Sequence, residues 1–86
     1  MPVPTSVDSP LRKIEKAKNK KILVRLKDGE EYIGILSDMD TFMNMVLDDA
    51  EEFKDGQRIR KYGKIFIRGN NIIYVIVDYE DFAGKE

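Results

Sequence analysis

The sequence has no cysteine, no histidine and no tryptophan among its 86 residues. Without cysteine it cannot form a disulfide framework, and without histidine it lacks a common zinc ligand and the base of most catalytic triads. No apolar run approaches the ~18 residues of a membrane span, and the N-terminus lacks the apolar core of a signal peptide. We therefore expect a cytoplasmic protein with no membrane segment, no metal site and no cofactor.

Charges of the two signs nearly cancel but are segregated along the chain. The 15 basic and 16 acidic residues give a net charge of −1, which supplies no overall attraction to nucleic acid or anionic membrane. Residues 11–27 are strongly basic, residues 28–55 are strongly acidic, and basic side chains return over residues 58–68. The first basic segment could contact phosphates. A lysine-rich helix is more often a solvated face, and we favour that interpretation.

The length predicts one domain. A domain of this size buries only about 60–65% of its extended-chain surface, so oligomerisation is a common source of further stability. Residues 1–8 hold two prolines and no periodicity, which predicts a flexible arm. Residues 9–78 are expected to form the domain, and residues 79–86 an acidic, loose tail.

A short helix is predicted over residues 9–18. Ser9 is a good N-cap, and Pro10 at the first helical position loses no hydrogen bond. The apolar side chains recur at helical spacing in one stripe: Leu11, Ile14 and Ala17. A helix this short is marginal alone in water, so we expect the stripe to dock on the rest of the domain.

The remainder predicts five antiparallel strands with short turns. The expected strands cover residues 21–27, 31–38, 42–51, 58–68 and 72–77. The turns are predicted at Asp28-Gly29, Asp40-Thr41, Asp55-Gly56 and Gly69-Asn70-Asn71. Gly34 interrupts the second strand, where a missing side chain permits a sharp bend or the close approach of another backbone. The predicted fold is mainly β: a short helix, then a strongly bent five-stranded antiparallel barrel.

The last strand has no polar face. Residues 72–77 are apolar throughout, as in strands that are covered on both sides. At an open edge such a strand is an aggregation hazard. Either it is buried within a monomeric barrel, or a neighbouring subunit covers it and head-to-tail pairing closes a ring. The pattern alone favours neither alternative.

Two groups of residues have a spacing typical of one family. The first is Leu26-x-Asp28-Gly29, Gly34-x-Leu36 and Asp40-x-Phe42-Met43-Asn44, and the second is Ile67-Arg68-Gly69-Asn70-Asn71-Ile72. They closely resemble the two halves of the Sm signature, and the chain resembles an archaeal Sm-like (Lsm) protein over residues 22–77. The resemblance implies a helix before five bent strands, in agreement with the pattern. It also implies a ring of six to eight subunits, most often seven, around a central pore.

For function, the resemblance implies non-catalytic binding of single-stranded, uridine-rich RNA, one base per subunit, in RNA processing or stabilisation. Carried over by motif position, Phe42 stacks on the base, Asn44 reads its edge and Arg68 closes the sandwich. The residue types suit these roles, because an aromatic ring stacks on any base and an amide offers both a donor and an acceptor. RNA-processing proteins are further implied partners.

Each of these side chains also has a structural alternative. Phe42 could cover the barrel mouth, Asn44 could stabilise a turn, and Arg68 could form an ion pair with Asp40. Gly69 is expected to let the backbone turn close to the ligand. In supporting roles, Asp40 and Met43 are expected to hold the loop.

Two positions depart from the common archaeal pattern. Many relatives carry histidine where this chain has Phe42, which keeps the stacking face but removes a hydrogen-bonding group. Many carry aspartate where this chain has Asn70, an amide that can orient neighbours but gives no charge assistance. We therefore expect the pocket to bind RNA, but not to read uridine strictly.

Two other function classes compete with this hypothesis. An oligomeric scaffold for proteins, with little or no RNA binding, is the main alternative. A Mg²⁺-dependent nuclease would use the acids between residues 28 and 55. Those acids are predicted mostly in turns and on exposed strand faces, so we expect no enzyme.

Overall fold

The computed structural model describes residues 10–77. The predicted arm (1–8), the Ser9 cap and the predicted tail (79–86) lie outside the described residues. The elements are α1 (Pro10–Glu15), β1 (Lys21–Leu26), β2 (Glu31–Met39), β3 (Met45–Lys54), β4 (Gln57–Ile67), the 3₁₀ turn η1 (Gly69–Asn71) and β5 (Ile72–Ile76). A short helix followed by five strands is the predicted fold class, which is confirmed.

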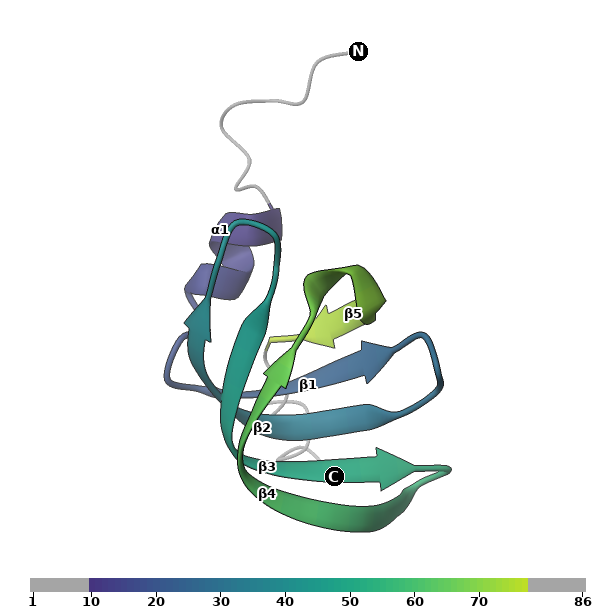
Figure 1. The fold of residues 1–86 in the computed structure, drawn as a ribbon. Helices are drawn as coiled ribbons and strands as arrows, with labels where there is room; N and C mark the ends of the chain where they lie inside the picture. Colours follow the sequence, from purple (N-terminus) through teal and green to yellow (C-terminus); the bar gives the residue numbers. More distant parts are fainter. Residues whose placement is uncertain (1–9, 78–86) are drawn as a thin grey trace.

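The strands form one antiparallel sheet in the order β4-β3-β2-β1-β5. The sheet is strongly bent, and β2, β3 and β4 curve along their length (Figure 1). It does not close within one chain, because β4 and β5 are its two edges and do not pair with each other. The expected barrel is therefore an open, bent sheet with two free edges.

Gly34 explains part of the bend. The register between β2 and β3 shifts between Ile33 and Ile35, on either side of this glycine. A Cβ on Gly34 would lie 3.0 Å from both the Cα of Ala50 and the carbonyl oxygen of Asp48. The predicted close approach of another backbone is confirmed, and a side chain here would separate the two strands.

The core lies inside the bend and is closed by the helix. Its buried residues come from α1, the turn after it and four strands: Ile14, Ala17, Ile22, Val24, Leu36, Met45, Leu47, Ala50 and Ile67. The helix is shorter than predicted and ends at Glu15. The chain then continues in a tight turn, in which the Ala17 N–H donates to the Ile14 carbonyl at 2.9 Å and Asn19 adopts a φ of +70°. This turn, not a further helical turn, buries Ala17.

One strand prediction is wrong, and one of the two alternatives for the last strand is excluded. The third strand was expected from residue 42, but β3 begins at Met45, so residues 42–44 lie in a loop. Phe42 and Asn44 therefore do not share a strand face. The last strand is not buried within one chain, because Ile73 and Tyr74 on β5 are 57% and 43% exposed. Between residues 10 and 77 no helix is long and apolar enough to cross a membrane.

Candidate nucleic-acid interface

The loop between β2 and β3 is organised by a single carboxylate. Asp40 Oδ1 accepts hydrogen bonds from the backbone N–H groups of Phe42 (2.9 Å) and Asn44 (3.0 Å), and its Oδ2 accepts from Asn44 Nδ2 (2.9 Å). The bond from Asn44 Nδ2 is the main reason why the pKa of Asp40 lies below its ordinary value of 3.8. Met43 adopts a φ of +68° and packs against the core. The loop is thus held in one shape by its own side chains.

The loop between β4 and β5 lies directly against the first loop. The Gly69 N–H donates to Asn44 Oδ1 at 2.7 Å. A Cβ on Gly69 would overlap the carbonyl oxygen of Phe42 and would lie 2.8 Å from the carbonyl carbon of Met43. Glycine was expected here for a turn close to the ligand. The structure gives a different reason, which is contact between the two loop backbones.

Asn44 is fixed at both ends of its amide. Its Nδ2 donates to a carboxylate and its Oδ1 accepts from a backbone N–H, so the two ends of the amide are distinguished by their partners. An amide has two N–H donors and two acceptor lone pairs. One donor and one acceptor position therefore remain for a ligand. The proposed turn-stabilising role of Asn44 is present, and it leaves the base-reading role open.

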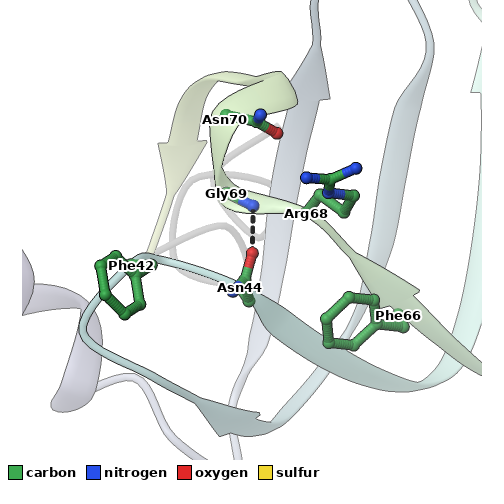
Figure 2. Close-up of a pocket in the computed structure, with 6 residues that line it drawn as sticks. All are labelled: Phe42, Asn44, Phe66, Arg68, Gly69 and Asn70. Carbon is green, nitrogen blue, oxygen red and sulfur yellow. Dashed lines mark hydrogen bonds between the residues drawn. The ribbon is translucent and has the colours of Figure 1, made fainter.

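The predicted residues surround one hollow of ≈ 500 Å³. It is lined by Phe42, Asn44, Phe66, Arg68, Gly69 and Asn70, so five predicted site residues meet there (Figure 2). The ring of Phe42 is 78% exposed and does not cover the core. The alternative role of Arg68, an ion pair with Asp40, is absent from the described residues, which leaves the guanidinium available to a ligand.

Phe66 is a site residue that the sequence motifs did not predict. Its ring is 64% exposed on β4 and lines the hollow from the side opposite Phe42, with Asn44 between them (Figure 2). The alternation in β4 turns Ile67 inward and Phe66 outward. A large aromatic residue on the outward face two positions before Arg68 was the available signal. Its nearness to the first loop depends on the pairing of Val46 with Phe66, which local sequence does not fix.

Three acidic residues of β3 have structural partners outside this hollow. Glu51 pairs with Arg58 at 2.9 Å and Asp48 with Lys64 at 3.4 Å, both across β3 and β4. Glu52, which is 8% exposed, accepts a hydrogen bond from the Tyr62 hydroxyl at 2.7 Å. Over residues 10–77, no group of three acidic side chains is placed to hold a metal ion.

Comparison with known proteins places the chain in a family. The family model for the LSM domain matches residues 12–77. An snRNP Sm-like protein of Methanococcoides burtonii is 48% identical over 66 residues, which cover 77% of this chain and 92% of the relative. The LSM complex subunit lsm6 of Schizosaccharomyces pombe is 46% identical over 67 residues, covering 78% and 89% of the two chains.

Solved structures agree in fold. The Sm protein of Pyrococcus abyssii, solved in complex with a uridine heptamer, is 42% identical, with a TM-score of 0.78 over 80% of this chain and 97% of that one. A heptameric archaeal Sm protein is 35% identical, with a TM-score of 0.70 over 76% and 94% of the two chains. The bent five-stranded sheet, the two loops in contact and the LSM domain match lead to one conclusion: this chain belongs to the Sm-like (LSM domain) family.

Proposed function

We propose that this protein is a non-catalytic, ring-forming RNA-binding protein that takes one base of single-stranded RNA per subunit. The observation that carries the proposal is the anchored amide of Asn44. It retains one donor and one acceptor in a hollow that Phe42 and Arg68 also line. A uracil edge offers the O4 acceptor and the N3–H donor side by side, which is the complementary pair.

The aromatic and cationic side chains complete the binding chemistry. The exposed ring of Phe42 gives a stacking face for a base, a contact worth ~1–3 kcal/mol. The planar guanidinium of Arg68 stacks on the second face of the base or binds a phosphate. The likeness to the Pyrococcus abyssii protein, which was solved with a uridine heptamer, supports uridine as the favoured base.

The two free edges of the sheet support the proposed ring. β4 and β5 each have one unpaired side in a single chain, and apolar side chains are exposed on both: Ile59 on β4, and Ile73 and Tyr74 on β5. Pairing of β4 of one subunit with β5 of the next would cover both edges, and repetition of a head-to-tail contact closes a ring. The heptameric relative favours seven subunits. Seven weak pockets in one ring bind successive nucleotides at high effective concentration.

The proposal is tested by fluorescence anisotropy of labelled oligo-U and oligo-A at about 0.1 M salt, where phosphate contacts are moderately screened. The wild-type protein should bind oligo-U more tightly than oligo-A. Arg68→Ala should weaken the binding of oligo-U by roughly tenfold or more. Arg58→Ala is the matched control, because Arg58 lies on β4, which ends directly before Arg68, but pairs with Glu51 away from the hollow.

Two results would overturn this function. Binding of neither oligomer by a properly assembled ring would instead support the protein scaffold. Mg²⁺-dependent cleavage of the RNA that disappears when one carboxylate is replaced would show an enzyme. Native mass spectrometry of the same samples reports the subunit number.

A further inference from the structure

Phe66 is an exposed aromatic side chain that lines the hollow but makes none of the contacts proposed for a single base. It projects from an edge strand, and 64% of its surface is accessible to solvent. Covering the ring would be favourable, because burial of apolar surface lowers the free energy. Figure 2 places it across Asn44 from Phe42, at the other side of the hollow. The distal position relative to Phe42 means that a base stacked on one ring leaves the other ring free.

A second, smaller hollow continues from Phe66 over the sheet. It measures ≈ 160 Å³ and is lined by Asp38, Met39, Asp40, Asn44, Val46 and Phe66. Asp38, Val46 and Phe66 form one row across three strands, because Asp38 pairs with Val46 and Val46 pairs with Phe66. Neighbouring strands are about 4.8 Å apart, so Phe66 and Asp38 are separated by about 10 Å along this row. The row thus presents the aromatic ring of Phe66, the apolar side chain of Val46 and the carboxylate of Asp38, in that order.

We propose that Phe66, Val46 and Asp38 form a second base subsite, which takes the nucleotide adjacent to the one held by Phe42 and Asn44. The inference rests on the proposed RNA binding and deepens it from one base to two bases per subunit. Continuity carries the assignment of the occupant, since both hollows share Asn44 and Phe66. When one nucleotide occupies the first hollow, the phosphodiester bond holds the next nucleotide of the strand close to the second hollow.

Asp38 sets the preference of the second subsite. An ionised carboxylate only accepts hydrogen bonds, so it favours a base with an exocyclic amino group and disfavours the O4 acceptor of uracil. Its Oδ1 already accepts from the Met39 N–H at 2.9 Å, and the side chain is exposed. Adenine, cytosine and guanine carry such an amino group. Adenine has a larger stacking face for Phe66 than cytosine, and unlike guanine it presents no carbonyl oxygen to the carboxylate. The second subsite therefore favours adenine beside uridine.

Dinucleotides test the proposal directly. Isothermal titration calorimetry of the assembled ring compares the affinities of uridine 3′-monophosphate, UpU, UpA and ApU. Both mixed dinucleotides are included because the direction in which the strand runs across the two subsites is not known. One of the mixed dinucleotides should bind about tenfold more tightly than the mononucleotide, as expected for one added stacked base. UpU should gain less than that dinucleotide.

Variants assign the gain to residues. Phe66→Leu should reduce the ratio of dinucleotide to mononucleotide affinity by about tenfold, and Phe66→Trp should preserve it. Asp38→Asn should reduce the preference for adenine over uracil in the second position by about fivefold, the range of one hydrogen bond. Ile59→Leu is the matched control, because Ile59 is an exposed apolar residue of β4 that lines neither hollow.

The outcomes separate the two proposals. If oligo-U and the mononucleotide bind but no dinucleotide gains affinity, the second subsite is wrong and the single-base function stands. If no nucleotide binds, the proposed function itself fails. If Phe66→Leu dissociates the ring in native mass spectra, Phe66 is a contact between copies and the subsite is wrong.

A spectroscopic readout does not depend on a variant folding. With 4-fluorophenylalanine incorporated, the mononucleotide should shift the ¹⁹F resonance of Phe42, and the favoured dinucleotide should shift those of both Phe42 and Phe66. A Phe66 resonance that stays unchanged on dinucleotide binding would overturn the subsite.

Discussion

The two loops of the candidate site and the two edges of the sheet differ in how complete they are within one chain. In the loops, Asp40 and Asn44 satisfy three backbone N–H groups, and Gly69 fits against Phe42 with no space for a side chain. At the edges, β4 and β5 leave one side of each strand unpaired and expose large apolar side chains. A single chain can therefore build the pocket, but it cannot cover its own sheet.

This difference separates two contributions to RNA binding. The chemistry of each pocket depends on hydrogen bonds inside a subunit, whereas the affinity for a long strand depends on how many pockets are held together. Changes at the edges should therefore affect long RNA and leave mononucleotides alone. Changes in the loops should affect both.

The largest effect is expected from breaking an edge. Ile73→Lys places a charge on β5 at a residue that is 57% exposed and has no partner in the register with β1, so the single chain should still fold. The ring should dissociate, and oligo-U affinity should fall by roughly 10²- to 10⁴-fold while mononucleotide affinity is kept. Native mass spectrometry and titration measure the two quantities. An intact ring in Ile73→Lys would contradict the assignment of β5 as a subunit interface, and Ile73→Val is the control.

The next effect tests the contact between the loops. Gly69→Ala places a Cβ against the carbonyl of Phe42, so the loops must separate and the bond from the Gly69 N–H to Asn44 is lost. We expect a loss of about 2–3 kcal/mol of stability and a fall of roughly 100-fold in affinity for both mononucleotide and oligo-U. Thermal unfolding and titration check this.

Gly63→Ala is the matched control for that variant. Gly63 lies on β4, the strand that precedes Gly69, and a Cβ there would meet nothing within 4 Å. A Gly69→Ala protein that melts and binds like Gly63→Ala would show that the loops are not held by their contact.

A smaller effect is expected from the carboxylate that organises the first loop. Asp40→Ala removes the acceptor of three N–H bonds, and affinity for uridine nucleotides should fall about tenfold. The hydrogen bond from Asn44 holds the pKa of Asp40 below its ordinary value of 3.8. A carboxyl group with a lowered pKa stabilises the loop above pH 3.8, and that stabilisation is lost as the pH falls through the folded-state pKa.

This gives the Asp40 prediction a pH signature. The ratio of wild-type to Asp40→Ala affinity should be constant from neutral pH down to about 4.5 and should fall below pH 4. A ratio that changes between pH 5 and 7 would mean that another group controls the loop.

The smallest effect distinguishes two roles of Arg68. Arg68→Lys keeps the charge but loses the planar guanidinium, so oligo-U affinity should fall about fivefold if the side chain stacks on the base. If Arg68 instead only contacts a phosphate, affinity and its dependence on salt concentration should both match wild type. Titration of wild type, Arg68→Lys and Arg68→Ala at several salt concentrations decides between them.

Much of the fold and of the site was predictable from local chemistry. The Asp-Gly turns, the glycine at position 34 and the apolar alternation predict strands and bends that the structure contains. The spaced motifs predict five residues that line the hollow. The predicted start of the third strand was wrong because Asp40 accepts hydrogen bonds from the backbone N–H groups of Phe42 and Asn44. The alternation of apolar residues alone cannot reveal these bonds.

The remaining differences depend on contacts between distant segments. Phe66 joins the hollow only through the register between β3 and β4. Gly69 is required by a loop 25 residues away, where the bond to Asn44 forms. Neither fact is encoded within a few neighbouring residues, so both needed the three-dimensional structure.

The anchored amide of Asn44 has a consequence for the thermodynamics of recognition. Its side-chain torsions are already fixed in the free protein by Asp40 and Gly69. A flexible polar side chain would lose about 0.5–1.5 kcal/mol of conformational entropy on meeting a base, and this one has lost it during folding. Discrimination among bases should therefore appear chiefly in the enthalpy of binding, and selectivity should decrease on heating.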